Sequence, residues 1–416
     1  AQGGVDPLPV ARAKGSHFWT ADGRRFLDFN SQLMCVNIGH GDERVIRAIQ
    51  AQAEVLPYAS PQMATEPRAR LGAKLATLTP GDLDVFFFTT GGSEAVENAI
   101  RLARAYTGRH KILVRYRSYH GATAGAMSLT GDPRRWANEP GISGVVRVLD
   151  PYHGIERGWD DAPTSLRMLE EVIQLEGAHT IAAFILESVT GTNGILIPPD
   201  GYMQGVRELC TRHGILMIAD EVMSGFGRTG RWFAIDHWHV VPDLMTMAKG
   251  LTSAYVPLGA VAMRQSIADH FRNTPYFSGL TYGNHPLACA AALATLQVYE
   301  DDDLIAEAAR KGELMHALLA DLAARHALVG AVRNIGLFGI VELVRDRETM
   351  TPLAPFNGTS PEMAILSAES RARGLYTMVR WHTFFTNPPL SITDDELRDG
   401  FAIIDQALTA VAQLAS

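Results

Sequence analysis

Short apolar runs alternate with amphipathic stretches through the middle of the chain. The runs have the length of buried strands, while the stretches repeat their apolar residues with the period of a helix. Strands are expected at 86–88, 111–115, 181–186, 215–219 and 259–263, and helices at 93–106 and 201–213. Strands that alternate with helices build βαβ units, so the pattern predicts an α/β fold around a mainly parallel sheet. Functional loops are expected at the carboxyl ends of its strands.

The last third of the chain has a different pattern. Long helical stretches are followed by a strand, a further helix and a closing amphipathic helix, at 286–300, 304–326, 337–344, 361–373 and 394–414. Near the start, the sequence predicts a hairpin whose turn is Asp22-Gly23. We therefore expect a large domain (46–285) that carries the functional residues and a smaller α+β domain (286–416). An N-terminal segment (1–45) is expected to pack with the smaller domain.

Composition supports a compact protein of more than one domain. The 416 residues are 47% apolar and 20% charged, which argues against disorder. The formal net charge of -8 gives no global basic field, so we expect neither nucleic acid nor an anionic membrane as a partner. An anionic substrate would instead need individual Arg or Lys residues in a pocket.

Cysteine usage and the start of the chain bear on the compartment. Cys35, Cys210 and Cys289 are odd in number, far apart and without a CxxC pair, so we expect no disulfide framework, no zinc site and a reducing cytoplasm. Residues 1–10 lack the basic and apolar regions of a signal peptide. No apolar run approaches the roughly 20 residues of a membrane helix.

Three features that follow predicted strands or apolar runs carry candidate chemistry. Gly92 and Ser93 open a helix after a strand, where backbone amides bind phosphate; the alternative is a turn with a helix cap. Asp220 ends an apolar strand, where a carboxylate can pair with a protonated ring nitrogen; the alternative is a turn cap. Lys249 follows another apolar run, and burial would make its amine nucleophilic; the alternative is a lysine that reaches solvent.

Two further positions fit a planar, phosphorylated ligand. Tyr119 follows a strand and can stack on a ring, although a core tyrosine would look the same. Thr281 precedes a helix and can donate to a phosphate, although an ordinary loop would look the same. Glu221, beside Asp220, is expected to be structural. No single residue identifies the function, but the order and joint spacing of these residues do.

In that order and spacing the sequence resembles the class III aminotransferases, the fold-type I pyridoxal-phosphate enzymes that include omega-amino acid:pyruvate transaminases. The resemblance covers nearly the whole chain. Its blocks lie at 22–28, 35–41, 92–95, 119–121, 220–230, 242–250, 281–286 and 388–390. The most specific block is 220–230, with Lys249 placed 29 residues after Asp220.

The resemblance implies a role for each matching residue. Lys249 would hold pyridoxal 5'-phosphate as a Schiff base and move the proton during catalysis. Asp220 would keep the pyridine nitrogen of the cofactor protonated. Val222 and Tyr119 would contact the two faces of the ring, and Glu187 would support the network near Asp220.

The phosphate contacts implied by the resemblance involve two subunits. Gly92 and Ser93 would bind the phosphate of their own subunit's cofactor, while Thr281 would reach the phosphate in the partner subunit. The implied assembly is therefore a homodimer with shared active sites. Whether dimers pair into tetramers is left open.

The implied reaction is ping-pong transfer of an amino group from a primary amine or omega-amino acid, such as beta-alanine or taurine, to a keto acid. Pyruvate is the expected acceptor and 2-oxoglutarate the alternative. Met34 stands where the family often has an aromatic residue. Arg380, with Trp381 beside it, is the candidate for the acceptor carboxylate, although ungapped counting puts Met378 at the family's arginine position. Thr192 would make the pocket more polar than one for aryl amines.

Other functions are compatible with parts of this pattern. An aminomutase or a decarboxylase of the same fold would use the same cofactor residues. A non-catalytic binding protein is the alternative from a different class. Retention of Lys249, Asp220 and the Gly92-Ser93 pair argues against it, because packing alone does not require that combination.

Overall fold

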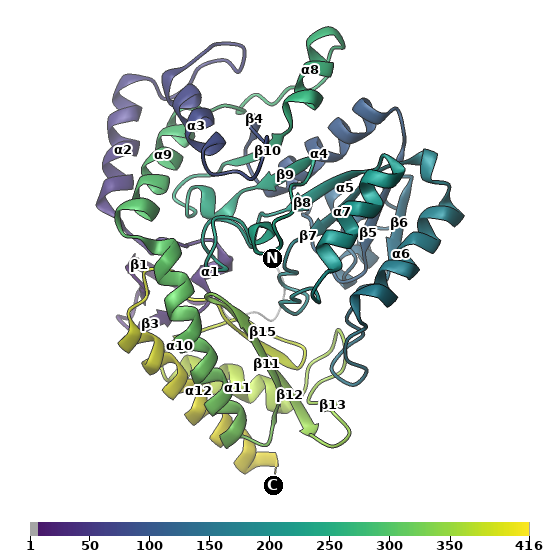
Figure 1. Cartoon of the computed structure of the whole chain (residues 1–416). Helices are drawn as coiled ribbons and strands as arrows, with labels where there is room; N and C mark the ends of the chain where they lie inside the picture. Colours follow the sequence, from purple (N-terminus) through teal and green to yellow (C-terminus); the bar gives the residue numbers. More distant parts are fainter. Residues whose placement is uncertain (1–6, 416) are drawn as a thin grey trace.

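The computed structural model describes residues 7–415; residues 1–6, part of the stretch assessed for a signal peptide, and residue 416 lie outside the described part. The described residues form three sheets (Figure 1). The largest has seven strands in the order β4-β10-β9-β8-β7-β5-β6. Their bounds are β4 (Val85–Thr89), β5 (Lys111–Arg115), β6 (Val145–Val148), β7 (Ile181–Glu187), β8 (Leu216–Asp220), β9 (Leu244–Met247) and β10 (Gly259–Met263).

The strands of this sheet are mainly parallel, as expected. Neighbours from β6 to β9 run parallel, and β10 pairs antiparallel with both β9 and β4. All of β7 is buried, which explains its uninterrupted apolar run. Helices connect and cover the strands (Figure 1), namely α4 (Gly92–Thr107), α5 (Ala124–Leu129), α6 (Ala162–Glu176) and α7 (Tyr202–His213).

The C-terminal third forms a second layered unit. Its sheet has the order β11-β12-β16-β15, with β13 paired to β12. The strands are β11 (Val329–Ile335), β12 (Phe338–Asp346), β13 (Thr351–Pro352), β15 (Val379–Arg380) and β16 (Thr383–Thr386). Figure 1 shows this part below the large sheet, with α9 (Pro286–Asp301), α10 (Leu304–Arg325), α11 (Pro361–Ala372) and α12 (Asp394–Ala415).

The third sheet joins the two ends of the chain. It has the order β1-β2-β3-β14, with bounds Val10–Lys14, His17–Thr20, Arg25–Asp28 and Leu375–Tyr376. The predicted hairpin is confirmed, since β2 and β3 pair antiparallel. Strand β14 pairs parallel with β3, placing Leu375 opposite Leu27. Nearby, the Ser31 hydroxyl donates to the Asn387 carbonyl at 2.8 Å, a contact between residues 356 positions apart. The division of the chain at 45 and 285 remains our proposal.

Six strands of the large sheet, β4 to β9, have their carboxyl ends at one edge. Because β10 is antiparallel to both β4 and β9, the carboxyl end of β4 lies at the same edge as those of β7, β8 and β9. The remaining helices are α1 (Ser31–Met34), α2 (Glu43–Val55), α3 (Glu66–Ala76), α8 (Gln265–Asn273) and the 3-10 turns η1 (Pro133–Asn138), η2 (Ala178–Thr180), η3 (Ala234–Trp238) and η4 (Lys249–Leu251). Among residues 7–415, no helix has both the length and the apolar character needed to span a bilayer.

Candidate active site

A cavity of about 490 Å³ lies at this edge of the large sheet. It brings together most of the residues singled out in the sequence, namely Met34, Gly92, Ser93, Tyr119, Glu187, Asp220, Val222, Lys249 and Arg380. Two others do not line it. Thr281 is exposed on a loop, where its carbonyl accepts from the Tyr58 hydroxyl at 2.8 Å. Trp381 lines a neighbouring cavity and packs against Phe356.

Asp220 is a buried, firmly held carboxylate at the end of β8. Its side chain is almost fully enclosed and Oδ2 lies 2.6 Å from Nδ1 of His120. Oδ1 accepts from the Thr246 hydroxyl at 3.0 Å and from the Val222 amide at 3.1 Å. These contacts fix the direction in which the carboxylate faces. Sequence reasoning missed the histidine, although its neighbour Tyr119 was chosen.

Glu187 ends the next strand and faces Asp220 in register. It accepts from the Tyr119 amide at 3.0 Å and from the Gly191 amide at 2.8 Å. Burial raises the pKa of the Glu187 carboxyl, with His120 opposing the rise and Asp220 adding to it. The carboxyl therefore connects two loops at the cavity wall and sets the position of Tyr119.

Lys249 lies just after β9, in a turn where its backbone φ is +38°. The residue is half-buried, and its side chain lines the cavity. Burial lowers the pKa of its amine, while the acidic groups of Cys35, Asp220 and Glu187 partly offset that effect. In the described part of the chain, the amine has no hydrogen bond or ion pair. A desolvated, unpaired amine of this kind is suited to act as a nucleophile and base.

The turn between β4 and α4 forms a cradle for an anion. Helix α4 begins at Gly92 and its first-turn amides have no partner within the helix. A Cβ on Gly92 would lie 2.8 Å from Cγ1 of Val222, so a side chain there would collide with the cavity wall. The Ser93 hydroxyl accepts from the Ala122 amide at 3.0 Å. The Glu94 carboxylate accepts from the amide and the hydroxyl of Thr90. It therefore does not occupy the Gly92 and Ser93 amides, which are suited to bind a phosphate.

Two arginines also line the cavity. Arg380 was predicted there, and Met378 lies beside it. Arg134 was not predicted; its Cζ lies 3.6 Å from the ring centroid of Tyr119. One face of that ring is therefore covered by a guanidinium. Both arginines contact Asp132, another residue that sequence reasoning missed.

Glu221, next to Asp220, points away from the cavity into a fully buried site. Its carboxyl accepts from the Ser224 hydroxyl at 2.8 Å and from the Ala234 and Ile235 amides at 3.0 and 2.9 Å. Burial nevertheless raises its pKa to about 7. This residue holds the turn at η3, in agreement with the structural role expected for it.

The Glu221 carboxyl should make stability depend on pH. Its pKa is about 7 in the folded state and ordinarily 4.5, so between these values the folded protein holds a proton that the unfolded chain releases. The contribution of Glu221 to the free energy of unfolding should therefore fall by about 3 kcal/mol as pH rises from 4.5 to 7, and then level off. Urea unfolding at pH 5 and pH 8 measures this. Glu221→Gln should remove most of the difference; an unchanged difference would assign it to other groups.

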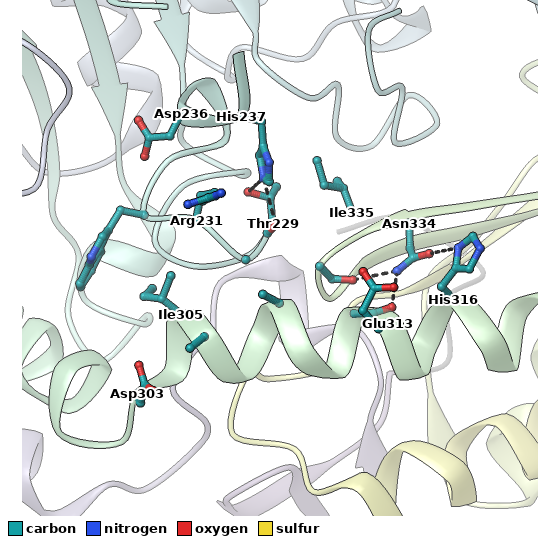
Figure 2. A pocket seen from close by; sticks show the side chains of 16 residues that line it. Thr229, Arg231, Asp236, His237, Asp303, Ile305, Glu313, His316, Asn334 and Ile335 are labelled. Carbon is teal, nitrogen blue, oxygen red and sulfur yellow. Dashed lines mark hydrogen bonds between the residues drawn. The ribbon is translucent and has the colours of Figure 1, made fainter. Parts of the chain in front are cut away.

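A different cavity, of about 860 Å³, lies between α10 and the loop that contains Thr229 (Figure 2). Charged side chains of both signs surround it, including Arg231, Asp303 and Glu313. Its floor is tight backbone packing, since a Cβ on Gly312 would lie 2.6 Å from the Gly336 Cα. It contains none of the predicted site residues, so the cavity at the sheet edge is the candidate active site.

Known proteins resemble the chain along most of its length. The model of the class-III aminotransferase family matches residues 1–408. The chain is similar to an omega-aminotransferase of Caulobacter vibrioides (40% identical, 81% of each chain) and to a taurine–pyruvate aminotransferase of Rhodobacter capsulatus (37% identical, 84% of this chain and 79% of that one). It also resembles the solved taurine:2-oxoglutarate aminotransferase of Bifidobacterium kashiwanohense in complex with PLP and glutamate (TM-score 0.96, 39% identical, 99% of this chain and 95% of that one).

Proposed function

Since the chain belongs to the class-III aminotransferases, which use pyridoxal phosphate, we propose that it moves the amino group of an omega-amino acid or primary amine, such as taurine or beta-alanine, to pyruvate. The observation that carries this proposal is that one cavity contains both the Lys249 amine, which has no hydrogen bond or ion pair among the described residues, and the fixed carboxylate of Asp220. The similarity to aminotransferases that act on omega-amino acids supports the donor class.

The residues of the cavity fit the cofactor. A buried carboxylate, an amine and a helix N-terminus are the three groups that a phosphorylated pyridine aldehyde requires. Gly92 supports the fit, because any side chain there would fill the space beside Val222. We therefore propose that Gly92 and Ser93 hold the phosphate, that Asp220 keeps the ring nitrogen protonated, and that Lys249 holds the cofactor covalently.

The bound cofactor supplies an electron-withdrawing ring that makes the carbon beside the amine acidic. Lys249 would take the proton from that carbon at Nζ and return it at another position. Asp220, fixed by His120 and Thr246, would keep its charge directed at the ring nitrogen throughout. Val222 and Tyr119 would restrain the ring, with Glu187 holding the Tyr119 loop in place.

A second acceptor, 2-oxoglutarate, is favoured by one observation. The cavity contains the guanidinium of Arg134 in addition to that of Arg380, and two cations suit a dicarboxylate. The similar taurine:2-oxoglutarate aminotransferase, solved with PLP and glutamate, supports this alternative.

We also propose a homodimer with shared active sites and a cytoplasmic location. Thr281 lies outside its own subunit's cavity on an exposed loop, where it could serve a partner. Large apolar side chains are exposed on and near that loop, among them Tyr58, Phe277 and Tyr282, and Tyr58 packs edge-on against Tyr282. Such a patch is typical of an interface. The three cysteines are unpaired, which supports a reducing compartment.

A half-reaction experiment tests the proposed function. The protein loaded with pyridoxal phosphate is mixed, without acceptor, with taurine, beta-alanine, gamma-aminobutyrate, putrescine, 1-phenylethylamine or alanine. Taurine or beta-alanine should convert the visible absorption band of the cofactor to the pyridoxamine form. Adding pyruvate or 2-oxoglutarate should then restore the band and rank the two acceptors. No conversion by any amine would contradict the proposal.

A further inference from the structure

A neighbouring cavity, beside the one at the sheet edge, is lined by both layered units of the fold. Its volume is about 840 Å³, within the range of small-molecule sites. The large-sheet unit contributes loops that contain Tyr116 and Thr192, and the C-terminal unit contributes Phe356 and Trp381. Thr192 lines both cavities, and its hydroxyl accepts from Nη2 of Arg134 at 2.9 Å. The amino-transfer reaction proposed above uses no other residue of this lining except Trp381, which is only a candidate there.

Arg117 brings an unpaired positive charge to the neighbouring cavity. Its backbone amide donates to the Asp150 carboxylate at 2.7 Å, which fixes the loop after β5. Its guanidinium has no hydrogen bond and no ion pair among residues 7–415. Instead, its Cζ lies 5.1 Å from the ring centroid of Tyr152 and 6.0 Å from that of Phe356. Two aromatic rings thus restrain the cation and leave its N–H donors available.

The other charged side chains of the lining are paired, neutral or exposed. Four have partners, namely Arg135 with Glu139, His153 with Asp160, Arg345 with Glu362, and Glu342 with Arg333. Burial lowers the pKa of the His382 imidazole, which is therefore neutral at pH 7. Glu156 is exposed, so water screens its charge. The guanidinium of Arg117 is thus the charge that a ligand would meet inside the cavity.

Two buried polar side chains of the lining lack a partner. Asn193 is 2% exposed, and its Nδ2 has no acceptor in the described part of the chain. Nδ1 of His382 is also buried and has no partner within residues 7–415. A buried donor without an acceptor costs free energy, so a ligand that supplies an oxygen is favoured at this place. Together with the Arg117 guanidinium, these groups are suited to a carboxylate.

Aromatic rings surround the same space. Tyr116, Trp136 and Phe356 line the cavity, and each is about half exposed, at 44%, 53% and 54%. The ring of Trp381 lies beside that of Phe356, with centroids 4.6 Å apart. Large apolar side chains that gather on an exposed surface are typical of a binding site. Their flat faces are suited to the ring of a planar ligand.

We propose that the neighbouring cavity is a second ligand site, and that it binds an aromatic carboxylate. Arg117 and Asn193 hold the carboxylate, and the exposed rings of the lining cover the ring of the ligand. The site is separate from the candidate active site, and its existence does not depend on the proposed transaminase reaction. Because both layered units line the cavity, a bound ligand contacts both of them.

Isothermal titration calorimetry on the pyridoxal-phosphate-loaded protein tests the proposal. The probes are 2-naphthoate and its uncharged counterpart, 2-naphthalenemethanol. The carboxylate should bind at least about tenfold more tightly than the alcohol, as expected for hydrogen bonds to a charged group. Arg117→Gln should weaken binding of 2-naphthoate at least about tenfold and leave binding of the alcohol nearly unchanged. Phe356→Ala, at an exposed position, should weaken binding of both probes.

Two further variants separate this cavity from the active site. Arg157→Gln is the matched control, because Arg157 is exposed on the same loop as Glu156 and does not line the cavity. Neither Arg157→Gln nor Arg380→Gln should change the affinity for 2-naphthoate. If Arg380→Gln weakened its binding and Arg117→Gln did not, the probe would occupy the active site and the inference would be wrong. Equal affinities of the wild type for the two probes, or no binding of 2-naphthoate at millimolar concentration, would also overturn it.

Discussion

Replacing Lys249 by alanine should lower turnover by about 10⁴-fold or more, at or beyond the upper end of what a positioned general base contributes. Among the described residues that line the cavity, Lys249 is the one lysine. It lies beyond the end of β9, and burial lowers the pKa of its amine. Its removal takes away both the covalent hold on the cofactor and the base that moves the proton. Single-turnover conversion of the donor measures the loss.

A second measurement on Lys249→Ala does not depend on turnover. Borohydride reduction should fix the cofactor to the wild-type protein and not to the variant, and the mass of the intact chain reports the difference. Lys111→Ala is the matched control, because Lys111 lies at the start of β5, away from the cavity, and pairs with Glu176. Turnover by Lys249→Ala within tenfold of the wild type would remove the central assignment.

Replacing Asp220 by asparagine should lower the rate of the first half-reaction roughly 10²–10³-fold, the range seen when one fixed electrostatic group is removed from a catalytic site. Asparagine has nearly the same shape and can still accept from Thr246 and Val222. It cannot hold a ring nitrogen in its protonated form, because its amide is neutral. Stopped-flow conversion of the cofactor by a saturating donor measures the effect.

The control for this variant leaves the charge in place. Thr246→Val removes the hydroxyl that donates to Oδ1 of Asp220 while the carboxylate and its contact with His120 remain. Its rate should stay within about tenfold of the wild type, since one neutral hydrogen bond contributes little. If Asp220→Asn and Thr246→Val had the same small effect, another group would have to face the ring nitrogen.

Strand ends explain how much of the site was predictable. Glu187 and Asp220 end apolar strands, and Lys249 follows one, so a parallel sheet must bring them to one edge. Their roles came from the resemblance, and the strand pattern indicated only that Asp220 lies where an apolar strand stops. Elements with a weaker signal were not predicted, such as β9, which has only four residues, and β11, which is half-exposed along most of its length.

Contacts between distant segments set the limit of that reasoning. His120 meets Asp220 from 100 positions away, and Arg380 meets Asp132 from 248 positions away. Locally, Asp132 is an ordinary helix cap before a proline, and nothing in its neighbourhood distinguishes it from a surface turn. Its contact with Arg380 depends on a side chain supplied by β15, and no local sequence pattern predicts that contact.

The sheet that joins the two ends of the chain has a consequence for biosynthesis. Strand β3 leaves the ribosome tens of seconds before β14, at ordinary rates of translation. Until residue 375 has emerged, the edge of β3 that will pair with Leu375 stays open, and an open strand edge is a site for misassembly. Expression conditions that slow translation should therefore lengthen the interval in which this edge is exposed, and chains truncated ahead of Leu375 should aggregate.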